Sequence, residues 1–391
     1  MIGESLVRLA QKPQRTIAGF MSGTSMDGVD VVIARIRGCG PDTAIDLLGY
    51  DSVPYEPALR ERLLSLQLPG TFNAFDVADL SFRVGDLHSD VLENLATRTG
   101  IPLSDIDLIG YSGLGLYHAN RMNVDLGEAN VLADRTGATV ICDLRMADCA
   151  AGGLGAPLSP YVDWILFADP EKSRAVQNIG GIANVCAIPA GATVDDLIGF
   201  DTGPGNMVID GLISLLSDGR ETFDRDGRVA ASGQVNESLL AELMAHPYIR
   251  AGLPKCTGRE EFGEFYAADV LVRARSRGTS DADTVATATA FTARAIADSY
   301  DRFIAPFCRI DEVIVGGGGV HNPTLMGMVR DLLAPIPVRT HEDFAIPSDA
   351  REALSWAILA NETLHGRPAN VPQITGARRR VILGKITPPT S

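Results

Sequence analysis

The 391-residue sequence lacks several patterns that would assign a class at once. No run approaches the ~20 apolar residues that cross a bilayer, and no apolar stretch of signal-peptide length follows the basic residues near the N-terminus. We therefore expect a cytoplasmic protein without a membrane partner. The phosphate-binding pattern Gly-x-x-x-x-Gly-Lys-Ser/Thr is also absent, and so is the glycine fingerprint of dinucleotide-binding sheets.

Cysteine and positive charge are scarce as well. The six cysteines are scattered with no Cys-x-x-Cys pair, which argues against a disulfide scaffold and favours reduced, buried thiols. No metal-ligating cluster is predicted. The formal net charge is −15, so a nucleic-acid partner is a poor expectation. An anionic nucleotide can still be held locally, by backbone N–H groups and Mg²⁺.

The composition is that of a folded globular protein, with 46% hydrophobic and 21% charged residues. Each half of the chain opens with a strand, a glycine turn and a second strand, which is a weak internal repeat. The repeat predicts an α/β protein with mixed sheets flanked by helices, in two similar lobes with a ligand cleft between them. The four strands are expected at Thr16–Met21, Val29–Ile36, Arg174–Asn178 and Ala183–Ile188.

Two domains fit a chain of this length. We place the first lobe at residues 1–143 plus about 372–391, and the second at 144–371. The tail after Gly376 is basic and then rich in proline, so we expect it to fray.

The glycine turn of the first half is unusually rich in serine and threonine. Small residues let the backbone approach a phosphate closely, and hydroxyls add hydrogen-bond donors. Asp27 or Asp30 could help to place Mg²⁺. An ordinary hairpin turn is the alternative. The nucleotide-binding residues predicted here are Gly23, Thr24, Ser25, Met26, Asp27, Gly28, Val29 and Asp30.

Two further glycine turns could complete a nucleotide site. Gly180 and Gly181 join two apolar strands, which alone is a common hairpin but together with the first turn could form the other wall of a phosphate site. A strand expected at Glu312–Val315 stops at four glycines, which suits the close approach of a flat ligand such as adenosine. The predicted contacts of this last turn are Gly317, Gly318 and Gly319.

Asp201 is the predicted catalytic residue. It precedes a Gly-Pro-Gly loop that leads into a helix expected at Asn206–Leu216, whose N-terminal N–H groups and dipole favour an anion. A carboxylate within hydrogen-bond reach of an attacking atom can act as a general base. The alternative is that Asp201 caps the turn. Gly203 and Asn206 are predicted substrate-binding residues of this loop.

Three residues elsewhere are candidates for the substrate side. Arg145 and Asp148 precede a glycine-rich loop, and Arg145 can clamp a carboxylate or a sugar hydroxyl. Glu352 stands early in an expected helix, where the helix dipole explains an acid without any function.

Taken together, the motifs resemble those of the anhydro-N-acetylmuramic acid kinase family, within the actin-like superfold that sugar kinases share with Hsp70 and actin. The likeness runs from about residue 17 to residue 377. The motifs that carry it are Met21-Ser-Gly-Thr-Ser-Met-Asp-Gly-Val-Asp30, Gly152-Gly-Leu-Gly-Ala-Pro-Leu158, Asn178-Ile-Gly-Gly-Ile-Ala-Asn184, Gly199-Phe-Asp-Thr-Gly-Pro-Gly-Asn206, Phe223-Asp-Arg-Asp-Gly227 and Gly317-Gly-Gly-Val-His-Asn322.

The resemblance implies a kinase of cell-wall recycling that uses ATP and Mg²⁺. Water would open the 1,6-anhydro bridge of the sugar at C1, and the freed O6 would take the γ-phosphate, giving N-acetylmuramate 6-phosphate. In this interpretation Asp201 activates the water and Glu352 is a carboxylate on the substrate side. The family also implies a homodimer.

The chain departs from the family pattern on the sugar side. Where the family has His, Gln and Thr in one strand, this sequence has Ser112, Leu114 and Gly115, and Leu154 stands in place of another Gln. Ala147 replaces an Arg that is frequent before Asp148. A related kinase for a different anhydro sugar is therefore one alternative, and a nucleotide-binding regulator without turnover is another.

Overall fold

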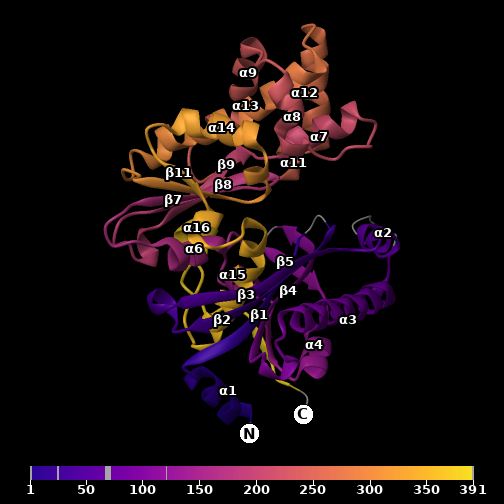
Figure 1. The fold of residues 1–391 in the computed structure, drawn as a ribbon, viewed down its shortest axis with the longest axis vertical. Helices are drawn as coiled ribbons and strands as arrows, with labels where there is room; N and C mark the ends of the chain where they lie inside the picture. The colour runs from indigo at the N-terminus through magenta and orange to yellow at the C-terminus, as the bar shows by residue number, and fades with distance from the viewer. Residues whose placement is uncertain (1, 24–25, 67–71, 120, 390–391) are drawn as a thin grey trace. The chain divides into compact units, whose positions relative to one another are not determined.

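The computed structural model describes residues 2–23, 26–66, 72–119 and 121–389. The chain divides into two compact units, Met1–Leu166 with Asp349–Ser391 (unit 1) and Phe167–Ser348 (unit 2). Each unit has its own sheet and helices (Figure 1). The division differs from the boundaries expected at 143/144 and 371/372. The physical reason is that Tyr161 donates a hydrogen bond to Glu362 (2.7 Å) inside unit 1, so both flanking segments pack there.

The sheet of unit 1 has the strand order β12-β6-β4-β1-β2-β3, with β5 paired to β4. Strands β1, β2 and β3 form an antiparallel meander, whereas β4 and β6 run parallel to β1. The strands are β1 (Gln14–Ser22), β2 (Gly28–Arg37), β3 (Ala44–Pro54), β4 (Leu108–Ala119), β5 (Met122–Leu126), β6 (Thr139–Cys142) and β12 (Lys385–Thr387).

The sheet of unit 2 repeats this arrangement with the order β11-β10-β7-β8-β9. Strands β7, β8 and β9 form the antiparallel meander, and β10 and β11 run parallel to β7. The two units therefore share one topology, and the mixed α/β, actin-like fold class is confirmed. The cleft expected between the lobes stays a prediction. The strands are β7 (Arg174–Ile179), β8 (Ile182–Ile188), β9 (Ile198–Pro204), β10 (Glu312–Gly316) and β11 (Val338–Thr340).

Helices cover both faces of the unit 1 sheet. On one face α15 lies so close to the strands that a Cβ at Gly19 or Gly110 would come within 2.1 Å of its backbone oxygens. On the other face α3 begins at the Asn73 cap and ends at Gly100, which adopts φ 70° as a left-handed terminator. The helices are α1 (Ile2–Gln11), α2 (Pro57–Ser65), α3 (Ala74–Thr99), α4 (Ala129–Thr136), α5 (Met146–Ala150), α6 (Ser159–Phe167), α15 (Arg351–Leu364) and α16 (Pro372–Thr375).

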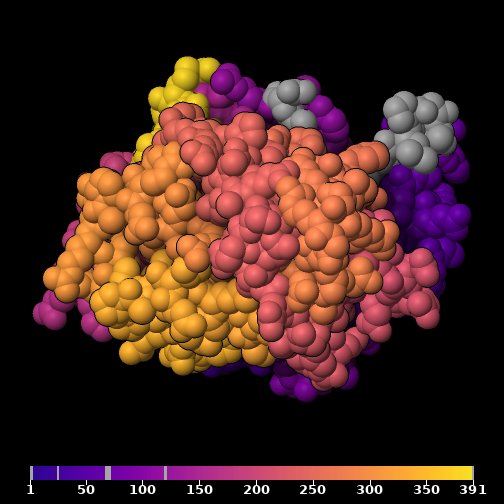
Figure 2. Space-filling view, turned by 90° about the horizontal axis from the view of Figure 1, so that it is seen from above, coloured from indigo at the N-terminus to yellow at the C-terminus, as the bar shows by residue number. Residues whose placement is uncertain are grey.

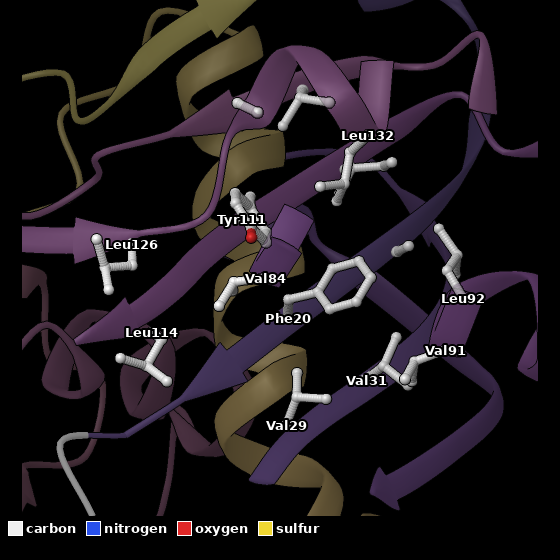
Figure 3. Packing of buried hydrophobic residues seen from close by; sticks show 14 of the residues in the cluster. Phe20, Val29, Val31, Val84, Val91, Leu92, Tyr111, Leu114, Leu126 and Leu132 are labelled. Carbon is white, nitrogen blue, oxygen red and sulfur yellow. The ribbon is translucent and has the colours of Figure 1, made fainter. Parts of the chain in front are cut away.

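The core of unit 1 lies between its sheet and α3. Val84 and Leu92 of α3 face Phe20 and Val31 of the strands (Figure 3), and all four side chains are fully buried. Burying one such side chain contributes roughly 1.5–3 kcal/mol. The same cluster contains Tyr111, whose hydroxyl is turned into the interior and needs a partner there.

The helices of unit 2 form a second layer over its sheet, and Figure 2 looks onto this helical surface, drawn in salmon to orange. Helix α13 carries small residues on its inner side, and its Thr292 hydroxyl donates to the carbonyl of Gly205. The helices are α7 (Met207–Leu216), α8 (Arg228–Ser232), α9 (Glu237–Met244), α10 (Pro247–Arg250), α11 (Arg259–Phe262), α12 (Glu264–Ser276), α13 (Asp281–Ser299) and α14 (Pro323–Leu333).

The expectation of a frayed tail after Gly376 is wrong. Strand β12 pairs antiparallel with β6, and Leu383 before it is fully buried. Apolar contacts and backbone pairing outweigh the basic, proline-rich composition that suggested disorder. Within the ranges that the structure describes, no helix is long and apolar enough to cross a membrane.

Candidate active site

The turn between β1 and β2 has two side chains buried in the core among its described residues. Met26 is fully buried with φ 52°, and Val29 is 1% exposed, so both side chains belong to the core of unit 1. Gly28 has no room for a Cβ, which would lie 2.5 Å from the carbonyl oxygen of Val53. Two of the predicted residues, Thr24 and Ser25, lie outside the described residues.

Asp30 follows the turn on β2 and lies among other acids. Burial raises the pKa of its carboxyl to about 6. The nearby carboxylates of Glu352, Asp27 and Asp349 raise it further, whereas a hydrogen bond with Ser52 acts in the opposite direction. Three predicted site residues of unit 1 thus lie within electrostatic reach of one another. Such a group of acids favours a cation.

Arg145 lies on the same unit, at the start of α5. Its guanidinium stacks over the ring of Trp356 at 4.9 Å and donates through Nη1 to the carbonyl of Gly155 at 3.0 Å. Burial lowers the pKa of Arg145, while the charges of Asp125 and Glu352 raise it. The side chain is therefore oriented, desolvated and already matched by carboxylates of its own unit.

Asp148 has a different position from the one expected of a substrate contact. It is fully buried, and its carboxylate accepts hydrogen bonds from the Gly155 backbone N–H (2.8 Å), Asn370 (2.7 Å) and Thr375 (2.8 Å). A Cβ at Gly153 would lie 2.1 Å from its Oδ2. The structure therefore gives Asp148 the task of fixing the glycine-rich loop against the C-terminal segment.

Asp201 lies on β9 of unit 2, half-buried and held from several sides. Its Oδ2 accepts from the backbone N–H of Thr257 at 2.9 Å, and its backbone carbonyl accepts from the Tyr248 hydroxyl at 2.7 Å. Burial raises the pKa of its carboxyl to about 6, against the opposing effects of Thr257, Cys256 and Lys255. A carboxylate with this pKa is a base at neutral pH and is still able to hold a proton.

Lys255 supports the same region. It is 5% exposed, its ammonium lies 4.7 Å from the ring centre of Tyr248, and it donates to the carbonyl of Ile249 at 3.3 Å. Burial lowers the pKa of Lys255 to about 8. The segment around it provides the hydrogen bond that orients Asp201, through the backbone N–H of Thr257.

The backbone N–H groups at the start of α7 are hydrogen-bonded to the glycine turn between β7 and β8. The backbone N–H groups of Gly205 and Met207 donate to the carbonyl of Gly181 (2.9 and 3.1 Å), and that of Asn206 donates to Gly180 (2.8 Å). The expectation that these N–H groups are free for an anion is therefore wrong. The physical reason is that buried carbonyls of a tight turn also need donors, and α7 supplies them.

The three glycines that follow β10, Gly317–Gly319, differ in the room that each leaves for a Cβ. Gly317 has φ 81°, and a Cβ there would lie 2.5 Å from Oδ1 of Asn178; a Cβ at Gly319 would lie 2.4 Å from the side chain of Ile179. Close packing of the turn therefore accounts for both. A Cβ at Gly318 would make only one ordinary contact, at 3.7 Å with Asn206.

Gly318 and Asn206 open into a cavity of about 620 Å³ inside unit 2. The exposed Phe223 carries the Arg225 guanidinium 5.1 Å above its ring, at the wall of this cavity. Burial and the charge of Asp224 raise the pKa of the Asp210 carboxyl to about 7. An aromatic surface, carboxyl groups and a glycine backbone suit a flat, hydrogen-bonding ligand such as a nucleoside.

The comparisons with known proteins agree with this chemistry. A family profile described as anhydro-N-acetylmuramic acid kinase matches residues 15–389. The chain belongs to the anhydro-N-acetylmuramic acid kinase family. Anhydro-N-acetylmuramic acid kinase of Caldanaerobacter subterraneus subsp. tengcongensis is 41% identical over 98% of the chain and 100% of the relative, and that of Salinibacter ruber is 40% identical over 99% of each.

Two solved structures are similar to this chain at lower sequence identity. An activator of 2-hydroxyisocaproyl-CoA dehydratase from Clostridium difficile with bound ADPNP has a TM-score of 0.47 at 14% identity, covering 90% of this chain and 96% of that one. A ROK family glucokinase from Streptomyces griseus with glucose and AMPPNP has a TM-score of 0.36 at 14% identity, covering 89% and 99%.

For a member of this kinase family, the predicted site residues fall into two groups. The structure brings Asp27, Asp30 and Glu352 together in unit 1, and Asn206 with Gly318 in unit 2. Gly203 is buried with φ 143°, and a Cβ there would lie 3.0 Å from Ile249. The assignment of each residue to nucleotide or sugar stays a prediction.

Several residues of the site were missed by sequence reasoning. Asp210, Thr257 and Trp356 carry no motif of their own, because their roles depend on chain segments far away in sequence. Phe223 and Arg225 were noted only as part of a family motif. The exposed aromatic ring beside an arginine was the one signal that could have indicated a ligand surface.

Proposed function

We propose that this kinase hydrolyses the 1,6-anhydro bridge of anhydro-N-acetylmuramic acid and phosphorylates the freed O6 with ATP. One water oxygen becomes the C1 hydroxyl, the bond between C1 and the bridging oxygen breaks, and the γ-phosphoryl group moves to O6. The products are N-acetylmuramate 6-phosphate, ADP and a proton. The observation that carries the chemistry is the half-buried Asp201 carboxyl, oriented by Thr257 and with its pKa raised to about 6.

In this proposal Asp201 takes the proton from the attacking water. A general base is most effective when its pKa lies near the working pH, because it is then mostly ionised and still basic. The Thr257 N–H holds one carboxylate oxygen in place. The Tyr248 hydroxyl fixes the backbone of Asp201 and so limits its movement along β9.

We expect the β1–β2 turn to bind the phosphates of ATP. Mg²⁺ supplies charge neutralisation for phosphoryl transfer when it is bound. Among the described residues, no three His, Cys, Asp or Glu side chains are grouped as a metal site. Asp30 and the acids around it would help to hold Mg²⁺ bound together with the phosphates of ATP.

A coupled ADP-release assay with Mg-ATP tests this function. The sugars compared are anhydro-N-acetylmuramic acid, anhydro-N-acetylglucosamine, levoglucosan and N-acetylmuramic acid, with a control without sugar. We expect turnover on anhydro-N-acetylmuramic acid above all others. ADP release that is independent of sugar, or no ADP release with any sugar, would contradict the proposal.

We also expect a homodimer, which light scattering measures.

One observation favours a second candidate, a kinase for an anhydro sugar without a carboxylate. The positive charge of Arg145 is already matched by Asp125 and Glu352 within unit 1, which leaves less attraction for an anionic lactyl group. Leu114, at a position where the family has a glutamine, is fully buried in the core and offers no polar contact. Faster turnover of anhydro-N-acetylglucosamine or levoglucosan in the same assay would establish this alternative.

A further inference from the structure

A buried line of polar side chains crosses the core of unit 1 and ends at the β1–β2 turn. The Tyr111 hydroxyl lies 2.9 Å from Nδ1 of His88, and Nε2 of His88 lies 2.9 Å from the Tyr55 hydroxyl. The Tyr55 hydroxyl lies 2.7 Å from Oγ of Ser22, which donates to the carbonyl of Gly28 at 2.8 Å. We call these four side chains the hydroxyl–imidazole chain: Tyr111, His88, Tyr55 and Ser22.

The direction of every hydrogen bond in the hydroxyl–imidazole chain follows from its end. A carbonyl oxygen only accepts, so the single proton of Ser22 goes to Gly28. Tyr55 must then donate to Ser22, and Nε2–H of His88 must donate to Tyr55. A neutral His88 leaves Nδ1 as an acceptor for the Tyr111 hydroxyl. Each group donates one proton in the same direction, toward the turn.

The surroundings keep His88 neutral and fixed. The ring is fully buried and stacks on Phe20 at 5.7 Å between ring centres, and burial lowers its pKa to about 3. Gly127 leaves room for the Tyr111 hydroxyl, because a Cβ at Gly127 would lie 2.0 Å from that oxygen. A fully satisfied polar line in an apolar core favours one arrangement of the elements it joins.

The same line holds the turn at a second point. The backbone N–H of Tyr55 donates to the carbonyl of Asp27 at 2.9 Å, so Tyr55 contacts the turn through both its main chain and Ser22. The side chain of Arg60 donates to the carbonyl of Met26 at 3.1 Å. The turn of unit 1 is thus held from the interior at Met26, Asp27 and Gly28, which are among its predicted phosphate contacts.

We propose that the hydroxyl–imidazole chain consists of positioning residues that set the β1–β2 turn for the phosphates of ATP. The inference rests on the proposed function, because that function assigns the turn to ATP. No member needs to touch the nucleotide. Breaking the chain in its middle removes the donor that directs the Ser22 proton to the Gly28 carbonyl, so phosphate binding weakens while the sugar side is unchanged.

The test compares Tyr55→Phe with Tyr50→Phe. Both changes remove one phenolic oxygen from β3 or its end, but Tyr50 is exposed on the strand surface. For Tyr55→Phe we expect KM for ATP and the dissociation constant of AMP-PNP to rise about tenfold, equivalent to ~1.4 kcal/mol. KM for the sugar should stay within about twofold of the wild type. Tyr50→Phe should leave all three values unchanged.

A variant at the far end of the hydroxyl–imidazole chain gives a second comparison of KM for ATP. A general loss of stability would not reproduce the expected order of the two effects. Tyr111→Phe removes only the far end, so it should raise KM for ATP by less than Tyr55→Phe, about twofold. Tyr55→Phe with an unchanged KM for ATP, or equal rises in the KM values of ATP and sugar, would overturn the proposal. Because AMP-PNP binding needs no turnover, a failed kinase assay with normal AMP-PNP binding would refute the proposed function alone.

The tautomer of His88 provides a measurement on the unchanged protein. ¹⁵N spectra of histidine-labelled enzyme, assigned by the signal lost in His88→Gln, should show Nε2 protonated and Nδ1 bare from pH 5 to pH 8. A ring protonated at Nδ1 would overturn the proposal, because Tyr55 would then donate to His88 and Ser22 would lose the donor that leaves its own proton for Gly28.

Discussion

Two half-buried aspartates, one in each sheet, have the same raised pKa but differ in the charges and hydrogen-bond donors around them. Asp30 on β2 and Asp201 on β9 both have a pKa of about 6, and burial is the main cause in each. Asp30 is affected by three negative charges, those of Glu352, Asp27 and Asp349, and by one hydrogen bond with Ser52. The backbone N–H of Thr257, the thiol of Cys256 and the charge of Lys255 act on Asp201, together with the negative charge of Glu260.

Two sheets of the same topology can therefore hold one carboxylate suited to a cation and another suited to act as a base. Additional negative charge beside Asp30 is relieved by a cation, so this site suits phosphate-bound Mg²⁺. Donors beside Asp201 hold a single carboxylate in place without neutralising it, which suits a base. The four predictions that follow test this contrast, from the largest effect to the smallest.

Asp201→Asn should give the largest effect. It removes the base but keeps an oxygen that can accept from Thr257, so we expect turnover to fall by roughly 10²–10⁴-fold with nucleotide affinity within about twofold. Steady-state ADP release and AMP-PNP titration measure the two quantities. The exposed Asp195→Asn, on the segment before β9, is the matched control. Normal turnover in Asp201→Asn would exclude it as the base.

Asp30→Asn should weaken turnover through the metal. We expect a loss of roughly 10–100-fold at low Mg²⁺, equivalent to ~1.4–2.8 kcal/mol, that shrinks as the Mg²⁺ concentration is raised. A Mg²⁺ titration of activity in both variants measures this. The same titration should not restore Asp201→Asn. Identical Mg²⁺ dependence of Asp30→Asn and wild type would remove the distinction between the two acids.

The pH dependence of kcat/KM should contain both acids. Each carboxyl must be ionised to act, so activity should fall as the pH drops below about 6, with a slope steeper than one proton. In Asp30→Asn only Asp201 remains, and the slope of the residual activity should approach one. A profile that stays flat down to pH 5 would contradict both assignments.

The smallest effect concerns stability. The folded protein binds a proton at Asp201 more tightly than the unfolded chain, so Asp201 makes the wild type lose stability as the pH rises from about 3.8 to about 6. Asp201→Asn should therefore unfold at higher denaturant concentration at pH 7, by about 1 kcal/mol, and lose this advantage below pH 4. Equal stability gains at both pH values would show that the cause is not the buried charge.

Much of the fold followed from local patterns in the sequence. The glycine turns and apolar runs located the first two strands of each meander. The segment after Tyr111 was harder, because β4 continues to Ala119 through glycines that usually end a strand. Its pairing with β5 is local, since Met122 of β5 stands opposite Ala119 of β4, but the glycines of β4 do not predict a continuous strand.

The candidate site was predictable where chemistry and glycine occur in one motif. Asp201 and the β1–β2 turn belong to this class. The hydrogen bonds of Asp148 were not predicted, because two of its three donors, Asn370 and Thr375, lie far away in sequence. Its role toward the substrate stays a prediction. The hydroxyl–imidazole chain left no sequence pattern at all, since its four members come from four separate elements and meet only in the folded core.

The most direct test of the proposed reaction is to follow the oxygen atom of the attacking water. The enzyme is run in H₂¹⁸O with Mg-ATP and anhydro-N-acetylmuramic acid, and the phosphorylated sugar is fragmented in a mass spectrometer at early times. We expect one ¹⁸O at C1 of the sugar and none in the phosphoryl group. Unlabelled product kept in the same water is the control for exchange. An unlabelled sugar, or ¹⁸O found in free phosphate instead, would contradict an attack on the anhydro bridge by water.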